Sequence, residues 1–222
     1  MEKKENETAN SASGKTSDMK KFLSNTLRDI QSIGYMKPEE IPNIDLYMDQ
    51  VTTLMDEKLK SSRRHDSDKL ITKTMINNYT KNNLLPPPEK KKYSREHVLT
   101  LLFIYYFKNI LSINDIQIIL NPLTKSYFGN KDGFKMEDVY REVFQLEEEE
   151  MKKLLKDIGK KYSIANNTFN DFPEEDRDFL HDFSLICQLS YDVYLKKMII
   201  EKMIDKMVAD RDSASDSTSE QL

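Results

Sequence analysis

Three consecutive prolines, Pro86 to Pro88, constrain the fold of this chain more than any other feature. Proline has no backbone N–H and clashes with the preceding helical turn, so a regular helix does not continue through this segment. The sequence before it predicts a helix from residue 73 to about 82, capped by Thr72 and ended by Asn83 in the left-handed conformation. The sequence after it predicts a helix from residue 95 to about 109 that is apolar on nearly every side. This second helix therefore belongs at the centre of a core.

The rest of the sequence also favours helices. Glycine is scarce, with five in 222 residues, and tryptophan is absent, whereas an α/β or all-β fold needs more glycine-rich turns. Hydrophobic residues recur at helical spacing in several further segments. They predict helices over residues 19–33, 43–59, 113–121, 136–161 and 173–208, and the third of these should stop at Pro122. We therefore expect an all-α fold.

The two ends of the chain differ in composition from its middle. Residues 1–18 and 209–222 are polar and lack hydrophobic periodicity, so they cannot bury enough apolar surface to offset the entropy of ordering. We expect both to be disordered tails. Between them we expect a short helix and connector over residues 19–40, a compact helical domain over 41–122 and a C-terminal helical region over 136–208.

Positive charge is concentrated in one segment. Residues 60–108 contain eleven Lys or Arg and four acidic residues, a net charge of +7 in a chain whose net charge is −4, so the remainder carries −11. A concentrated basic segment in an acidic protein suits contact with phosphates. A lysine-rich solvated surface would produce the same charge, and charge alone does not decide between the two.

One face of the helix predicted at residues 73–82 is polar. Helical spacing places five side chains together on it: Lys73, Thr74, Asn77, Asn78 and Lys81. Asparagine can pair with adenine through two hydrogen bonds, and lysine and threonine reach phosphates or base edges. We expect the first four to face the major groove of DNA and Lys81 to contact a phosphate. An ordinary solvated helix face is the alternative.

A short basic extension follows the prolines. Lys90, Lys91 and Lys92 precede Tyr93, and Arg95 opens the next helix. We expect the three lysines and Arg95 to contact backbone phosphates, with Tyr93 beside them. A helix with a polar face, a basic wing and a buried supporting helix would then follow one another in that order.

The string from Ile76 to Pro87, Ile-Asn-Asn-Tyr-Thr-Lys-Asn-Asn-Leu-Leu-Pro-Pro, resembles the recognition helix and turn of MerR-type regulators. Residues 98–110 resemble the hydrophobic third helix of that family, and Ser112 to Leu120 resembles its short fourth helix. Residues 41–120 are also similar to the bacterial family called domain of unknown function 1836, itself considered MerR-like. This similarity is carried in particular by residues 41–50 and 70–88.

The resemblance implies a bacterial transcriptional regulator whose winged helix-turn-helix domain, residues 41–122, binds double-stranded DNA. It places Tyr79 where its hydroxyl would reach a phosphate. Asn77 and Asn78 stand where the family has arginine and tyrosine, and the basic extension is shorter than the family's wing. A helical adaptor that keeps this fold but binds proteins through the same face is the alternative.

The last predicted helix has a broad apolar face rich in tyrosine and methionine. The face consists of Leu180, Phe183, Cys187, Tyr191, Tyr194, Met198, Ile204 and Met207. We expect it to pack on the preceding helix, with Cys187 as a buried thiol. Two alternatives are a homodimer through these helices, which would suit paired half-sites on DNA, and a small apolar ligand.

No residue pattern indicates catalysis. The three histidines, His65, His97 and His181, lack partners at metal-ligand spacing, and a single cysteine allows neither an internal disulfide nor a cysteine-based zinc site. We expect no metal or cofactor, and His97 to be either a structural or a surface histidine rather than a metal ligand. The first residues lack the apolar stretch of a signal peptide, and the longest apolar run, Val98 to Phe107, is about half a membrane span. We therefore expect a cytoplasmic protein that makes no membrane contact.

Overall fold

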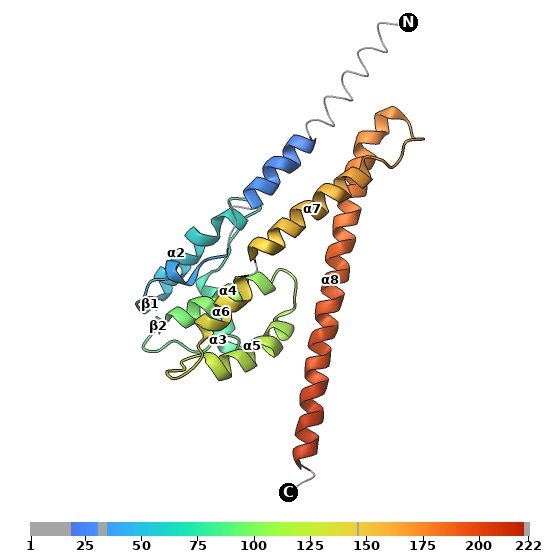
Figure 1. The fold of residues 1–222 in the computed structure, drawn as a ribbon. Helices are drawn as coiled ribbons and strands as arrows, with labels where there is room; N and C mark the ends of the chain where they lie inside the picture. Colours follow the sequence, from blue (N-terminus) through green and yellow to red (C-terminus); the bar gives the residue numbers. More distant parts are fainter. Residues whose placement is uncertain (1–18, 31–34, 146, 220–222) are drawn as a thin grey trace, which may run out of the picture. The chain divides into compact units, whose positions relative to one another are not determined.

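The computed structural model describes residues 19–30, 35–145 and 147–219 (Figure 1). These residues are mostly helical, which confirms the all-α class. The disordered tail expected over residues 1–18 lies outside the described residues. No helix in the described part of the chain is both long and apolar enough to span a membrane.

The described residues form two compact units. The core unit consists of residues 35–145 and 196–219, and the hairpin unit consists of residues 19–30 and 147–195. The elements of the core unit are η1 (Pro38–Glu40), β1 (Leu46–Tyr47), α2 (Met48–Leu59), η2 (Lys60–Ser62), α3 (Lys73–Lys81), β2 (Lys92–Tyr93), α4 (Arg95–Phe107), α5 (Ile113–Tyr127) and α6 (Met136–Phe144). The hairpin unit contains the helical residues 19–30, α7 (Glu147–Ala165) and the first part of α8 (Glu174–Ser219), whose last part belongs to the core unit.

Helix α4 lies at the centre of the core unit, as its sequence predicts. Every side chain from His97 to Tyr105 is buried, including the polar His97 and Thr100. The Thr100 hydroxyl donates to the Glu96 carbonyl at 2.8 Å, so its burial leaves no polar atom without a partner. A helix that is apolar around its whole circumference is stable only when other elements cover all of its sides.

A two-residue strand replaces the expected start of the second helix. The sequence predicted a helix from about residue 43, but α2 begins at Met48 because Leu46 and Tyr47 are extended and pair with β2. The pairing is antiparallel, with Leu46 opposite Tyr93 and Tyr47 opposite Lys92. Leu46 is buried and Tyr47 is exposed, which is the alternation of a half-buried strand.

Helix α5 continues through Pro122 to Tyr127, so the predicted stop at this proline is wrong. Pro122 has no N–H to donate to the carbonyl of Ile118, one turn earlier. The guanidinium of Arg211 donates to that carbonyl instead, with Nη1 and Nη2 each 3.1 Å from the oxygen. Arg211 lies near the end of α8, so a residue remote in sequence supplies the missing donor.

The boundary expected after residue 122 is also wrong, because α6 belongs to the core unit. Met136 and Tyr140 are buried in its core, and the Tyr140 hydroxyl donates to the Met36 carbonyl at 2.9 Å. The helix predicted over residues 136–161 is interrupted after Phe144, and α7 begins at Glu147.

The tail expected over residues 209–222 is helical as far as Ser219, and residues 220–222 lie outside the described residues. Ile204 is buried in the core unit, which holds this part of α8 against it. Lys206 pairs with Asp210 one turn later at 2.7 Å, and the Arg211 contact with α5 adds a further anchor. The prediction of a disordered tail was therefore wrong as far as Ser219. The polar composition of the tail does not show the contacts that hold this part of α8 against the core unit.

The apolar face of α8 does not pack as expected. Phe183, Tyr191 and Tyr194 are each more than half exposed, and Cys187 is exposed rather than a buried thiol. The side chain that α8 does bury in the hairpin unit is Leu185. In the hairpin unit the predicted face and the packed face are thus on different sides of the helix, whereas Ile204, also on the predicted face, is buried in the core unit.

Candidate nucleic-acid interface

Helix α3 has the polar face that the sequence predicts. All five side chains are exposed: Lys73, Thr74, Asn77, Asn78 and Lys81. The opposite side of the helix buries Ile76 and Tyr79 in the core. The helix begins where predicted, because the Thr72 hydroxyl accepts the Met75 N–H at 3.2 Å. The polar face is thereby fixed toward solvent by the burial of the other side.

The end of α3 is fixed by three hydrogen bonds. Asn83 has a φ of +55°, the left-handed conformation expected of it. This allows the N–H groups of Leu84 and Leu85 to donate to the Tyr79 carbonyl at 2.8 and 3.2 Å. The side-chain amide of Gln117, on α5, donates to the Asn82 carbonyl at 2.9 Å. The last turn of α3 is therefore attached to α5.

The basic extension is a tight turn with lysines at its two central positions. The N–H of Lys92 donates to the Glu89 carbonyl at 2.8 Å, and Lys90 and Lys91 have φ values of +48° and +65°. Positive φ at both central residues is the pattern of a type I′ turn, which favours Asn-Gly. Each left-handed lysine costs about 1 kcal/mol relative to an unstrained residue. Both lysines are exposed, so their charges extend into solvent.

Tyr47 lies beside the lysine turn. The sequence did not predict it as a residue of the interface. It is opposite Lys92 in the β1–β2 pair, and the Lys92 ammonium lies 5.4 Å from the centre of its ring. The Tyr47 side chain is 55% exposed. The available signal was the buried–exposed pair Leu46-Tyr47, but two residues are too few for a strand pattern to be recognised.

Asp49, in the first turn of α2, was also missed. Its carboxylate forms an ion pair with the Lys73 ammonium on α3. Both side chains are mostly exposed, so this pair contributes little to stability. It does place a negative charge next to the polar face of α3.

Two tyrosines expected at the interface are buried instead. Tyr79 and Tyr93 are 8% and 3% exposed, and burial raises the pKa of both phenols. Tyr93 contacts His97 edge to face, with ring centres 5.4 Å apart. Their rings support α3 and β2 from inside, so neither hydroxyl is placed to contact a phosphate.

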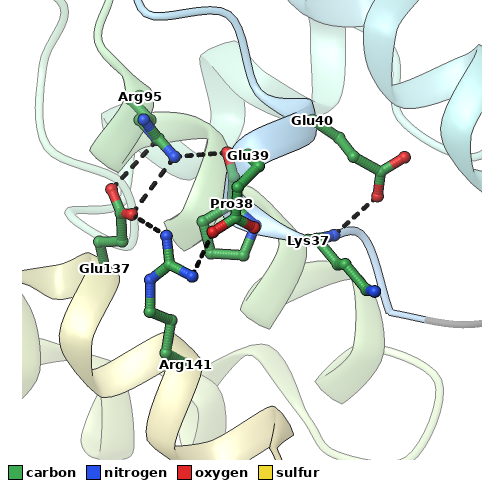
Figure 2. Close-up of polar contacts among 7 residues, drawn as sticks. All are labelled: Lys37, Pro38, Glu39, Glu40, Arg95, Glu137 and Arg141. Atoms are coloured by element: carbon green, nitrogen blue, oxygen red, sulfur yellow. Dashed lines mark hydrogen bonds and ion pairs between the residues drawn. The ribbon is translucent and has the colours of Figure 1, made fainter.

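Arg95, also expected to contact phosphate, is held within the protein (Figure 2). Its guanidinium donates to the Pro38 carbonyl at 2.5 Å and forms an ion pair with Glu137, where Nε and Oε2 are 3.1 Å apart. Glu137 also binds Arg141 at 2.6 Å, and Arg141 forms a further ion pair with Glu39. This network attaches η1 to α4 and α6, so the role of Arg95 is structural.

His97 is buried next to Tyr93 of β2. Its Nδ1 accepts the Ser94 N–H at 2.9 Å, which requires that Nδ1 carry no proton. The proton is therefore on Nε2, which lies 3.3 Å from the Pro87 carbonyl. The ring lies edge-on to Tyr93 and Phe128. His97 is therefore structural, which is one of the two roles expected of it.

Protonation of His97 should destabilise the fold at mildly acidic pH. Burial lowers the pKa of His97 below its ordinary 6.5, although the Pro87 carbonyl and the charge of Asp45 act in the opposite direction. Because the folded-state pKa is lower than the unfolded-state pKa, the stabilising contribution is complete above about pH 6.5 and is lost as the pH falls below it. Denaturant unfolding at pH 7.5 and 5.5 should show a lower free energy of unfolding at pH 5.5.

A matched pair of variants isolates this effect. His97→Gln should reduce the pH dependence between 7.5 and 5.5, whereas His65→Gln, which changes an exposed histidine, should leave it unchanged. Equal pH dependence in all three proteins would show that His97 does not titrate in this range.

Among the residues that the structure describes, no three His, Cys, Asp or Glu side chains are grouped so as to hold a metal ion. Residues 36–143 match the family model described as Domain of unknown function (DUF1836). No curated protein and no solved structure matches the chain. The matched range begins at Met36 and ends within α6, and so includes the two segments joined by Tyr140.

Proposed function

We propose that this protein is a cytoplasmic, MerR-like transcriptional regulator whose core unit binds double-stranded DNA. Helix α3 enters the major groove, and the turn at Lys90 and Lys91 contacts the phosphate backbone beside it. In this function the protein is not an enzyme and uses no cofactor.

The observation that carries the proposal is the lysine pair at positive φ. An Asn-Gly pair would relieve the strain of this turn, so the two lysines reduce stability where other residues would not. Both ammonium groups are exposed to solvent, so they do not offset the strain of the turn. We infer that the lysines bind a ligand, and phosphate is the ligand that two adjacent lysines suit best.

The surface around this turn supports the same reading. Lys92 lies across from the exposed Tyr47, and the polar face of α3 offers asparagine amides for base edges. Asn77 and Asn78 are the candidates for reading sequence, since each amide can both donate to and accept from adenine. The lysines carry no sequence information and would set affinity and position.

Selection from a random pool of duplex DNA tests this function with the full-length chain. The expected result is enrichment of a shared sequence, together with binding that weakens as salt is raised. An absence of both enrichment and salt-dependent binding would overturn DNA binding. Recovery of one stoichiometric protein partner under those conditions would favour the adaptor.

Removal of the Asp49 charge should strengthen DNA binding. Asp49→Asn frees Lys73 for phosphate and removes a repelling carboxylate, so affinity should rise roughly tenfold at about 0.1 M salt. The slope of log affinity against log salt should steepen by about 0.9. Fluorescence anisotropy with a labelled duplex measures both quantities.

Asp171→Asn provides the control, because it removes the same charge from an exposed position in the hairpin unit. It should leave the salt slope unchanged. If Asp49→Asn binds no better than Asp171→Asn, Lys73 lies outside the interface.

A further inference from the structure

The helical residues 19–30 and α7 enclose a cleft within the hairpin unit, which we call the hairpin cleft. Its volume is about 500 Å³, which is within the range of sites that bind small molecules. Both helices contribute to its apolar wall, which consists of Leu23, Leu27, Ile158 and Tyr162. The cleft is therefore large enough and apolar enough to hold an organic molecule.

Gly159 also lines the hairpin cleft, and it lies in the interior of α7. Glycine destabilises a helix interior relative to alanine, because it loses more backbone freedom on folding. A crowded neighbour or a left-handed backbone would account for a glycine here. Gly159 is not left-handed, and within the described residues no atom lies within 4 Å of the position that its Cβ would take. The glycine thus keeps the cleft open although it weakens the helix.

The hairpin cleft has a polar end and an apolar end. Residues 19–30 run antiparallel to α7 (Figure 1), so the start of the first helix lies beside the end of the second. The polar lining residues are thereby brought to one end: Lys20, Ser24, Ser163, Asn166 and Asn167. Leu27 and Ile158 line the other end.

The polar end is positively charged. Lys20 carries the only charge among the described residues that line the cleft. Hydroxyl and amide groups surround it, and the Asn167 amide is held by a hydrogen bond from its nitrogen to the Ser163 carbonyl at 2.7 Å. An ammonium group with further hydrogen-bond donors suits a carboxylate, and the apolar wall suits a hydrocarbon chain.

We propose that the hairpin cleft binds a medium-chain fatty acid. The carboxylate pairs with Lys20, and the hydrocarbon chain lies along the apolar wall and over Gly159. The length of the cleft fits this ligand, because Lys20 and Leu27 are about 10 Å apart along their helix. This binding involves no DNA, so its test is independent of the proposed function.

Isothermal titration calorimetry of the full-length chain with octanoate tests the proposal. We expect one saturable site per chain with a dissociation constant below about 1 mM. 1-Octanol, which lacks the charge, should bind roughly three- to fivefold more weakly. Acetate, which lacks the chain, should not saturate in this range. Failure of octanoate to saturate below about 1 mM overturns the proposal.

Gly159→Leu should separate ligand binding from stability. The new side chain fills the cleft, so the dissociation constant for octanoate should rise at least ~10-fold. The same change removes a glycine from a helix interior, so the melting temperature followed by circular dichroism should rise by about 2–4 °C. A glycine with a purely structural role would not give these opposite changes.

Ile164→Phe is the control for added bulk on α7. Ile164 is 47% exposed and lies outside the hairpin cleft, so its enlargement should leave octanoate binding unchanged. Octanoate binding that is equally strong in Gly159→Leu and in the parent chain would place the ligand elsewhere and overturn the proposal.

Lys20→Gln tests the carboxylate. It should weaken octanoate binding roughly three- to fivefold and leave 1-octanol binding unchanged, because only octanoate carries a charge for Lys20 to pair with. Lys21→Gln is the matched control, since this neighbouring exposed lysine does not line the cleft. It should affect neither compound. Equal octanoate affinities of the two variants would overturn the assignment of a carboxylate ligand.

Discussion

Lys90→Glu/Lys91→Glu should bind duplex DNA at least ~100-fold more weakly than the parent chain at about 0.1 M salt. Each phosphate contact contributes about a factor of ten under these conditions, and the slope of log affinity against log salt should become shallower by about 1.8. The turn holds both side chains in solvent, so their reversal should leave the core intact. Anisotropy titrations at several salt concentrations measure the affinity and the slope together.

A second variant of the same turn separates charge from conformation. Lys90→Asn/Lys91→Gly supplies the residues that a type I′ turn favours, and it should raise the free energy of unfolding by about 1 kcal/mol. It removes the same two phosphate contacts, so DNA binding should still weaken by about 100-fold. Stability and affinity would then change in opposite directions.

The charge control is Lys156→Glu/Lys160→Glu on α7, which reverses two exposed lysines in the hairpin unit. Its salt slope should equal that of the parent chain. Equal affinity of the parent and the turn variants would remove the lysine turn from the interface.

Tyr140→Ala should lower the free energy of unfolding by about 3–5 kcal/mol. The Tyr140 side chain is 1% exposed, and its ring lies 5.4 Å from that of Phe103 on α4 and 4.3 Å from that of Phe144. Truncation leaves a cavity between these rings and deprives the Met36 carbonyl of its donor. Guanidinium unfolding of the full-length chain measures the change.

Val143→Ala on the same helix is the matched control, because Val143 is 52% exposed and should cost less than about 1 kcal/mol. A loss for Tyr140→Ala as small as that for Val143→Ala would mean that α6 lies outside the cooperative core. The boundary at residue 122 that the sequence indicated would then be the better description of the domain.

Local signals in the sequence predicted the elements nearest the proposed interface. The bounds of α3 follow from Thr72 and Asn83, and the burial of α4 follows from its apolar circumference. The polar face of α3 follows from helical spacing alone. These features depend on residues within one or two turns of each other, which is why a single sequence contains enough information for them.

The wrong predictions concern features that depend on residues far apart in the sequence. Arg95 was expected to contact phosphate because its own segment is basic, but its partner Glu137 lies 42 residues away. Tyr47 was predicted to lie in a helix. Its extended conformation depends on pairing with β2, which the residues around Tyr47 do not reveal. The buried positions of Tyr79 and Tyr93 likewise reflect the packing of the whole core unit. Side-chain type alone does not reveal such contacts.

The contact between Arg211 and the Ile118 carbonyl has an evolutionary consequence. The carbonyl can accept two hydrogen bonds, and both now come from Arg211, so an N–H at position 122 would replace one of them and the carbonyl would stay satisfied. Loss of Arg211 before Pro122 instead leaves that carbonyl to solvent alone. Substitutions at these two positions should therefore have accumulated in a preferred order, with lineages losing the proline before the arginine.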